Sequence, residues 1–115
     1  MMQDGKFISY GITFDTGKSV IKPESAGELN RIVQLLKENP SLRFSVEGHT
    51  GATGSASANQ QLSEARAHAV VDRLVEMGID PARLTAKGCG QNNPFADNAS
   101  PEGRAKNRRV EFVKL

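Results

Sequence analysis

The chain has 115 residues, a formal net charge of +2 and a single cysteine. This length suits one compact domain with one core, the small charge does not favour nucleic acid as a partner, and one cysteine excludes an intrachain disulfide. No apolar run approaches the ~20 residues of a membrane-spanning helix, so we expect no insertion of this segment into a membrane.

The N-terminal part predicts a strand, a polar turn and a helix. Residues 1–6 are expected to be a linker or a cloning remnant, and residues 7–14 alternate as a strand does. The alternation places Ile8, Tyr10, Ile12 and Phe14 on one face of this strand and Ser9, Gly11 and Thr13 on the other. After a polar turn, Pro23 suits the first position of a helix that Asn39-Pro40 ends. Its apolar stripe consists of Leu29, Ile32, Val33 and Leu36.

A second strand and a second helix are joined by a glycine-rich turn. Residues 43–47 alternate polar and apolar, which predicts a strand with one buried face, and Gly48, Gly51 and Gly54 interrupt that pattern. The helix is expected to begin between residues 55 and 57, where residues 57–60 have the form of a capping box, and to end at Met77-Gly78. The expected apolar stripe is Leu62, Ala65, Ala69, Val70 and Leu74.

This turn has the chemistry of an anion site. A glycine-rich turn that enters a helix presents backbone N–H groups and a partly positive helix end. Arg66 follows early in the helix, and its guanidinium suits a carboxylate or a phosphate. The turn lacks the Lys-Ser/Thr pair of a phosphate-binding loop. Asn59 projects from nearly the same helix face as Arg66.

The C-terminal part predicts two more strands. Residues 84–88 form the third strand, residues 90–101 an exposed loop, residues 100–106 a short helix and residues 110–113 the last strand, with Val110 and Phe112 inward. This order of elements predicts a two-layer α/β sandwich, in which two main helices cover one face of a mixed sheet.

Several separated motifs occur in an order that is typical of one family. They are Gly48-His49-Thr50, Gly54, Asn59, Leu62-Ser63, Arg66-Ala67 and Asn107-Arg108-Arg109-Val110. Together they resemble the OmpA-like C-terminal domain, the peptidoglycan-associating module of Gram-negative envelopes. The resemblance covers nearly the whole chain, from about residue 12 to residue 112.

The resemblance implies non-covalent binding of the diaminopimelate residue in the peptidoglycan stem peptide. The ligand-binding residues that it implies are Arg66, Asn59, Thr16, Asp15, Gly51, Thr50, Arg108 and Asn107. Arg66 corresponds to the residue that holds the ligand's carboxylate. The family's Asp after Gly-His-Thr holds the ligand's ammonium group, but Gly51 stands there in this chain. Losing one partner of a desolvated charge pair costs roughly 2–5 kcal/mol, so the resemblance implies weakened binding unless another acid, such as Asp15, replaces the missing one.

Two local alternatives remain beside these assignments. Asp15 could simply tie down a turn through its own backbone, and the amide of Asn59 could cap the second helix. One of Arg108 and Arg109 could make a structural ion pair with Glu47 or Asp15 instead of framing the pocket.

The family implies a periplasmic, envelope-associated domain of a longer protein that is anchored at the outer membrane. The alternative is a periplasmic scaffold that has a degraded or engineered pocket and acts through envelope protein partners or a homodimer.

Catalysis, a metal and a cofactor are not expected. The two histidines, His49 and His68, lie on different elements, and no Cys/His cluster has the spacing of a metal site. Cys89 is interpreted as a small residue at a strand end. The basic cluster of Arg104, Lys106, Arg108 and Arg109 lacks interleaved aromatic residues, so nucleic acid is not expected either.

Overall fold

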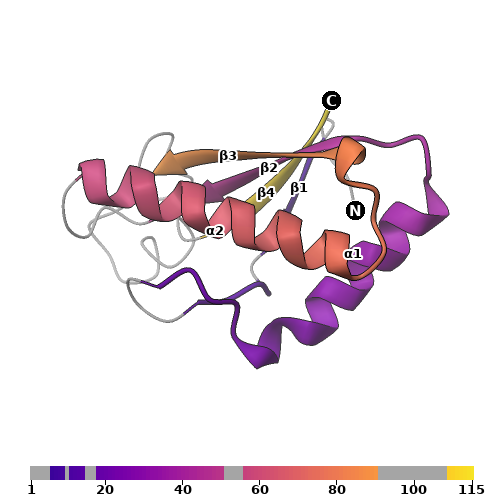
Figure 1. Cartoon of the computed structure of the whole chain (residues 1–115), viewed down its shortest axis with the longest axis horizontal. Coiled ribbons are helices and arrows are strands. Elements are labelled where there is room, and N and C mark those ends of the chain that lie inside the picture. The colour runs from indigo at the N-terminus through magenta and orange to yellow at the C-terminus, as the bar shows by residue number, and fades with distance from the viewer. Residues whose placement is uncertain (1–5, 10, 15–17, 51–55, 91–108) are drawn as a thin grey trace.

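The computed structural model describes residues 6–9, 11–14, 18–50, 56–90 and 109–115. Two helices lie on one side of a four-stranded sheet (Figure 1). The strands are β1 (Lys6–Ser9), β2 (Phe44–His49), β3 (Leu84–Gly90) and β4 (Val110–Lys114), and the helices are α1 (Ala26–Glu38) and α2 (Ala56–Glu76). Short 3-10 turns at Pro23–Ser25 and Pro81–Arg83 precede α1 and β3. The predicted two-layer α/β sandwich is confirmed.

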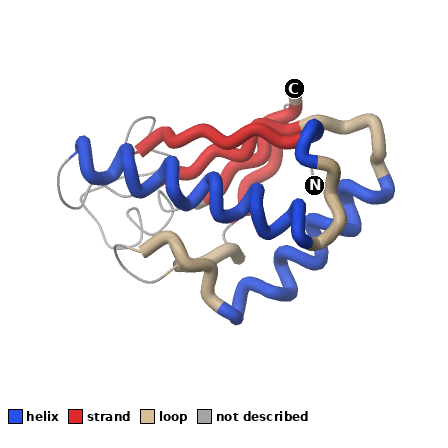
Figure 2. Tube along the Cα trace, viewed as in Figure 1, coloured by secondary structure: helices blue, strands red, loops and turns tan. Residues whose placement is uncertain are grey.

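The sheet is mixed, and its strand order is β1-β4-β2-β3. The last strand, β4, pairs antiparallel with both β1 and β2. β3 pairs parallel with β2, and α2 supplies the crossover that a parallel pair requires (Figure 2). Among the described helices, none combines the length and the apolarity that crossing a bilayer requires.

The core lies between the sheet and the helices. The rings of Phe7 and Phe112 stack with their centroids 4.7 Å apart, and Phe44 meets both rings edge-on. The predicted stripe of α1 is confirmed, because all four of its apolar side chains are buried. Val70 and Leu74 bring α2 into the same core.

The prediction for the first strand was wrong in length. β1 ends at Ser9, and its buried residues are Phe7 and Ser9, whereas Ile8 is only partly buried. The hydroxyl of Ser9 donates to Glu28 Oε2 of α1 at 2.5 Å, so this polar side chain is satisfied inside the domain. Phe14 forms an isolated antiparallel bridge with Ile21 instead of continuing the strand. Lys6, which was expected to lie in a linker, belongs to β1.

The second helix has the expected ends but a different inner face. Gly78 has φ +106°, which confirms the left-handed helix end. Ala65 is exposed, which contradicts its predicted place on the stripe. Val70 and Leu74 are buried as predicted, and the other buried positions are Asn59, Ser63, Arg66 and Ala67.

The proposed capping box at residues 57–60 is also wrong. Ser57 lies inside α2 rather than at its cap. The amide of Gln60 does not reach back to the helix start but donates to the Gly88 carbonyl at 2.6 Å and to Glu64 Oε1 at 3.1 Å.

Candidate functional site

The candidate ligand site lies where β2 and β3 end and α2 begins (Figure 1). The helix approaches the strands closely at this end. A Cβ atom on Gly88 of β3 would stand 2.6 Å from the backbone nitrogen of Glu64, so only glycine permits this approach. The close packing turns the first half of α2, with Asn59 and Arg66, towards the ends of the strands.

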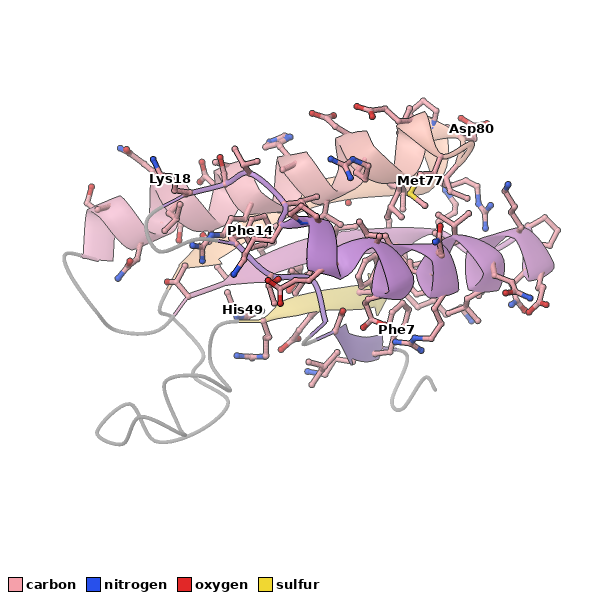
Figure 3. The ribbon with its side chains drawn as sticks, turned by 90° about the horizontal axis from the view of Figure 1, so that it is seen from below. Phe7, Phe14, Lys18, His49, Met77 and Asp80 are labelled. Atoms are coloured by element: carbon pink, nitrogen blue, oxygen red, sulfur yellow. The ribbon has the colours of Figure 1, made fainter. Side chains whose placement is uncertain are left out.

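Arg66 is a buried and firmly held cation. Its side chain lies on the inner face of α2, and the residue is 8% exposed. Its Nε donates to the Lys18 carbonyl at 2.8 Å, and its guanidinium carbon lies 4.9 Å from the centroid of the Phe14 ring. Phe14 and Lys18 come from the segment before α1, as Figure 3 shows. These two contacts fix the plane of the guanidinium, and a fixed plane favours the recognition of a carboxylate.

Asn59 and Thr50 are the other predicted ligand residues that the structure describes. Both are buried. Asn59 shares the inner face of α2 with Arg66, as the spacing predicted. Thr50 directly follows β2, and its Oγ1 is buried without a hydrogen-bond partner in the described part of the chain. A buried hydroxyl without a partner is costly, which makes Thr50 a ready hydrogen-bonding group for a ligand.

The remaining predicted ligand residues lie outside the described residues. They are Asp15, Thr16, Gly51, Asn107 and Arg108. Their roles, including the replacement of the missing acid by Asp15, therefore stay predictions.

A second polar cluster occupies the face of the sheet that is turned away from the helices. Val46 and Gly48 of β2 face the helices, so alternation places Glu47 on the opposite face. One ligand atom from each of Glu47, His49 and Cys89 lies within 4.8 Å of the others. We call these three residues the Glu47–His49–Cys89 cluster. The Cys89 thiol donates to Glu47 Oε1 at 3.6 Å.

This cluster was not predicted from the sequence, because the three residues do not share a metal-binding spacing. The three residues come together through the parallel pairing of β2 with β3. In this pairing Glu47 lies beside Lys87, and the two strands end next to each other. Linear spacing does not reveal such a pairing, since Glu47 and Cys89 are 42 positions apart.

A buried ion pair borders the cluster. Glu111 Oε2 accepts from Arg109 Nε at 2.6 Å, and Glu111 Oε1 lies 3.2 Å from Lys6 Nζ. Arg109 therefore makes a structural ion pair, as one of the two arginines was expected to do, and the carboxylate is that of Glu111. His49 Nε2 lies 3.6 Å from Glu111 Oε2.

These neighbours shift the proton affinities of the buried groups. Burial, together with the charge of Arg109, lowers the pKa of His49 to about 4, so the imidazole is neutral at pH 7. Burial alone would raise the pKa of Glu111, but His49, Arg109 and the hydrogen bonds from Arg109 and Lys6 lower it. Burial raises the pKa of Cys89 to about 11, and the neighbouring Glu47 carboxylate contributes to this shift.

The chain belongs to the OmpA family, because the family model described as "OmpA family" matches residues 13–108. Outer membrane porin F of Pseudomonas aeruginosa is 45% identical over 105 residues, which are 90% of this chain and 30% of the porin. Peptidoglycan-binding protein ArfA of Mycobacterium tuberculosis is 43% identical over 102 residues, which are 89% of this chain and 31% of ArfA. The chain thus spans less than a third of the length of either relative.

A solved structure supports the same relationship. The peptidoglycan-associated lipoprotein from Burkholderia pseudomallei matches with a TM-score of 0.81 and 27% sequence identity, and the match covers 90% of this chain and 88% of that one. The resemblance found in the sequence motifs is therefore confirmed at the level of the family and the fold.

Proposed function

We propose that this domain is a binding module that holds peptidoglycan non-covalently through the diaminopimelate residue of the stem peptide. It would tether a longer envelope protein to the cell wall from the periplasmic side, with that protein anchored at the outer membrane. Two relatives support this proposal by their names, since one is called peptidoglycan-binding and the other peptidoglycan-associated.

The observation that carries the proposal is the setting of Arg66. Arg66 is 8% exposed as a residue, and its guanidinium, which is bonded to the Lys18 carbonyl and lies against the Phe14 ring, is held before any ligand arrives. Little conformational entropy remains to be lost when such a group binds a carboxylate. In this proposal Arg66 binds the side-chain carboxylate of diaminopimelate. Asn59 and the Thr50 hydroxyl bind the polar groups of the ligand that lie next to this carboxylate.

The ligand's ammonium group is the weak point of the interaction. The family's acid is replaced by Gly51, so the ammonium group would depend on a substitute, for which Asp15 is our candidate. An unpaired charge would lower the affinity by about thirtyfold to several thousandfold.

Calorimetric titration of the unaltered domain and of Gly51→Asp, with free diaminopimelate and with a muropeptide containing it, tests the proposal. We expect Gly51→Asp to bind more tightly and Arg66→Met to lose binding. Arg73→Met is the matched control, because Arg73 lies on the same helix but its side chain is 44% exposed. It should bind as the unaltered domain does.

A second ligand tests the specificity for diaminopimelate. A muropeptide with lysine at the third position differs from the diaminopimelate form by one carboxylate, the group that Arg66 is proposed to bind. We expect the lysine form to bind more weakly, and the difference should vanish in Arg66→Met. If neither the unaltered domain nor Gly51→Asp binds any of these ligands, the peptidoglycan proposal fails, and a scaffold acting through protein contacts becomes the better explanation.

A further inference from the structure

We propose that the Glu47–His49–Cys89 cluster is a binding site for a zinc-like divalent cation. The three residues supply a carboxylate, an imidazole and a thiol, which are the three side-chain types that zinc takes as ligands. A water molecule would complete a tetrahedral site. This site is separate from the ligand site around Arg66, because it lies on the opposite face of the sheet.

The spacing of the ligand atoms suits a tetrahedral ion. With metal–ligand distances of about 2.0–2.3 Å, two ligand atoms of a tetrahedral zinc site are about 3.3–3.8 Å apart. Cys89 Sγ and Glu47 Oε1 are 3.6 Å apart, which lies within that range. All three ligand atoms lie within 4.8 Å of one another, so the longest separation needs to shorten by only about 1 Å.

His49 is an independent sign of a ligand. Its side chain is 4% exposed, and its Nε2 is buried without a hydrogen-bond partner among the residues that the structure describes. Either of the two ring nitrogens of His49 would serve as the ligand of a bound cation. Nε2 would bind the ion directly, or Nδ1 would bind it while Nε2–H donates to the nearby Glu111 carboxylate, as histidine ligands of zinc commonly do.

The charges also agree with a divalent ion. Metals bind the neutral imidazole of histidine. With Cys89 as a thiolate, the ligand set carries two negative charges, which match a divalent cation. The thiol must lose its proton on binding, and the ion replaces that proton as the partner of sulfur. The nearby cations Arg109 and Lys6 are already bonded to Glu111, and Lys87 is exposed on β3.

Cobalt titration of the tag-free, EDTA-treated protein tests the site. Cobalt(II) in a tetrahedral site absorbs visible light, and a cobalt–thiolate bond adds a charge-transfer band in the near ultraviolet. Cys89 is the only cysteine in the chain, so this band reports on one residue. We expect saturation at one equivalent with both signals, displacement of cobalt by zinc, and no displacement by magnesium, which prefers oxygen ligands.

Two variants and a matched control locate the ion. Cys89→Ser should lose the charge-transfer band, and Glu47→Gln should weaken cobalt binding by at least about tenfold, because even groups that only orient a ligand contribute about 10–100-fold to metal affinity. His68→Gln removes the other histidine, which is exposed on α2, and should leave both signals unchanged.

A test on the unaltered protein remains valid even if a variant fails to fold. In this protein, zinc should slow alkylation of the Cys89 thiol. The proposal is overturned if cobalt does not saturate at one equivalent, if cobalt binds without the charge-transfer band, if His68→Gln abolishes binding, or if zinc leaves the alkylation rate unchanged.

Discussion

Gly48 of β2 lies so close to Ser63 of α2 that a Cβ atom on Gly48 would stand 2.4 Å from the Ser63 carbonyl oxygen. The obstructing atom belongs to the backbone of a helix, so it has no rotamer that would move it away. The distance between the sheet and α2, and with it the position of Arg66, therefore depends on the absence of a side chain at residue 48.

We predict that Gly48→Ala destabilises the domain. The methyl group would push α2 away from β2, and overpacking of this kind costs about 1–3 kcal/mol. Gly27→Ala is the matched control, because nothing lies within 4 Å of a Cβ atom at this exposed position of α1. It should raise the free energy of unfolding by about 0.5–1 kcal/mol. Urea denaturation measures both changes, and equal effects would contradict the close packing.

Arg83 is predicted to be a major structural residue. Its guanidinium donates to the carbonyls of Leu42, Leu36 and Asn39 at 2.8–2.9 Å, so one side chain ties the end of α1 and the loop before β2 to the start of β3. Removing it in Arg83→Met should cost about 2–3 kcal/mol, since several charge-assisted hydrogen bonds are lost together.

The control for Arg83 is Arg43→Met. Arg43 makes one exposed hydrogen bond, to the Ala82 carbonyl at 3.3 Å, so its loss should change the stability by less than about 0.5 kcal/mol. Comparable losses in the two variants would mean that the three carbonyl contacts of Arg83 contribute little.

Stability is predicted to fall as the pH drops from about 6.5 to about 4. The folded state resists protonation of His49 until pH about 4, whereas the unfolded chain binds that proton near pH 6.5. The unfolded state therefore binds more protons within this range, and stability rises with pH across it. The shift corresponds to about 3 kcal/mol, and the lowered pKa of Glu111 adds a loss of the same sign at lower pH.

Urea denaturation in EDTA-containing buffers at several pH values measures this effect. His49→Gln should flatten the dependence above pH 4, because its amide does not titrate. His68→Gln should keep it, because His68 is exposed on α2. An unchanged slope in His49→Gln would assign the acid sensitivity to another group.

The contact between Phe14 and Arg66 is predicted to couple the two residues energetically. A guanidinium 4.9 Å from the ring centroid is within the range of a cation–π interaction, which contributes about 0.5–2 kcal/mol. A double-mutant cycle of Phe14→Leu and Arg66→Met should therefore show a coupling free energy of at least about 0.5 kcal/mol in unfolding. The same cycle with Arg73→Met should give none.

The sequence was sufficient to predict the parts of the fold that depend on apolar periodicity. The predicted stripe of α1 was correct because all of its inward residues are aliphatic. The predicted stripe of α2 was only partly correct, because the polar residues Ser63 and Arg66 are also buried on the inner face of this helix. Hydrophobic periodicity does not identify a buried polar side chain whose partner is distant in the chain. Ser9 of β1 shows the same effect, since its partner Glu28 is 19 positions away.

The two sites differ in how far they could be predicted. Arg66 and Asn59 were indicated by the glycine-rich turn and by the resemblance to the family, and both are buried on one face of α2. The Glu47–His49–Cys89 cluster has no such signature. It arises only when the parallel pairing of β2 and β3 brings distant positions together, which depends on tertiary structure rather than on local sequence.

The place of β4 in the sheet bears on how the domain is synthesised. The strand Val110–Lys114, which follows the other described strands in the sequence, fills the gap between β1 and β2, and contacts such as that of Lys6 with Glu111 join residues 105 positions apart. On the ribosome, β1 emerges before β4, its one partner among the described strands, and must wait until residues 110–114 have been made. A chain truncated before Val110 would keep both helices and the β2–β3 pair but would leave β1 unpaired and the Phe7 ring without the ring of Phe112.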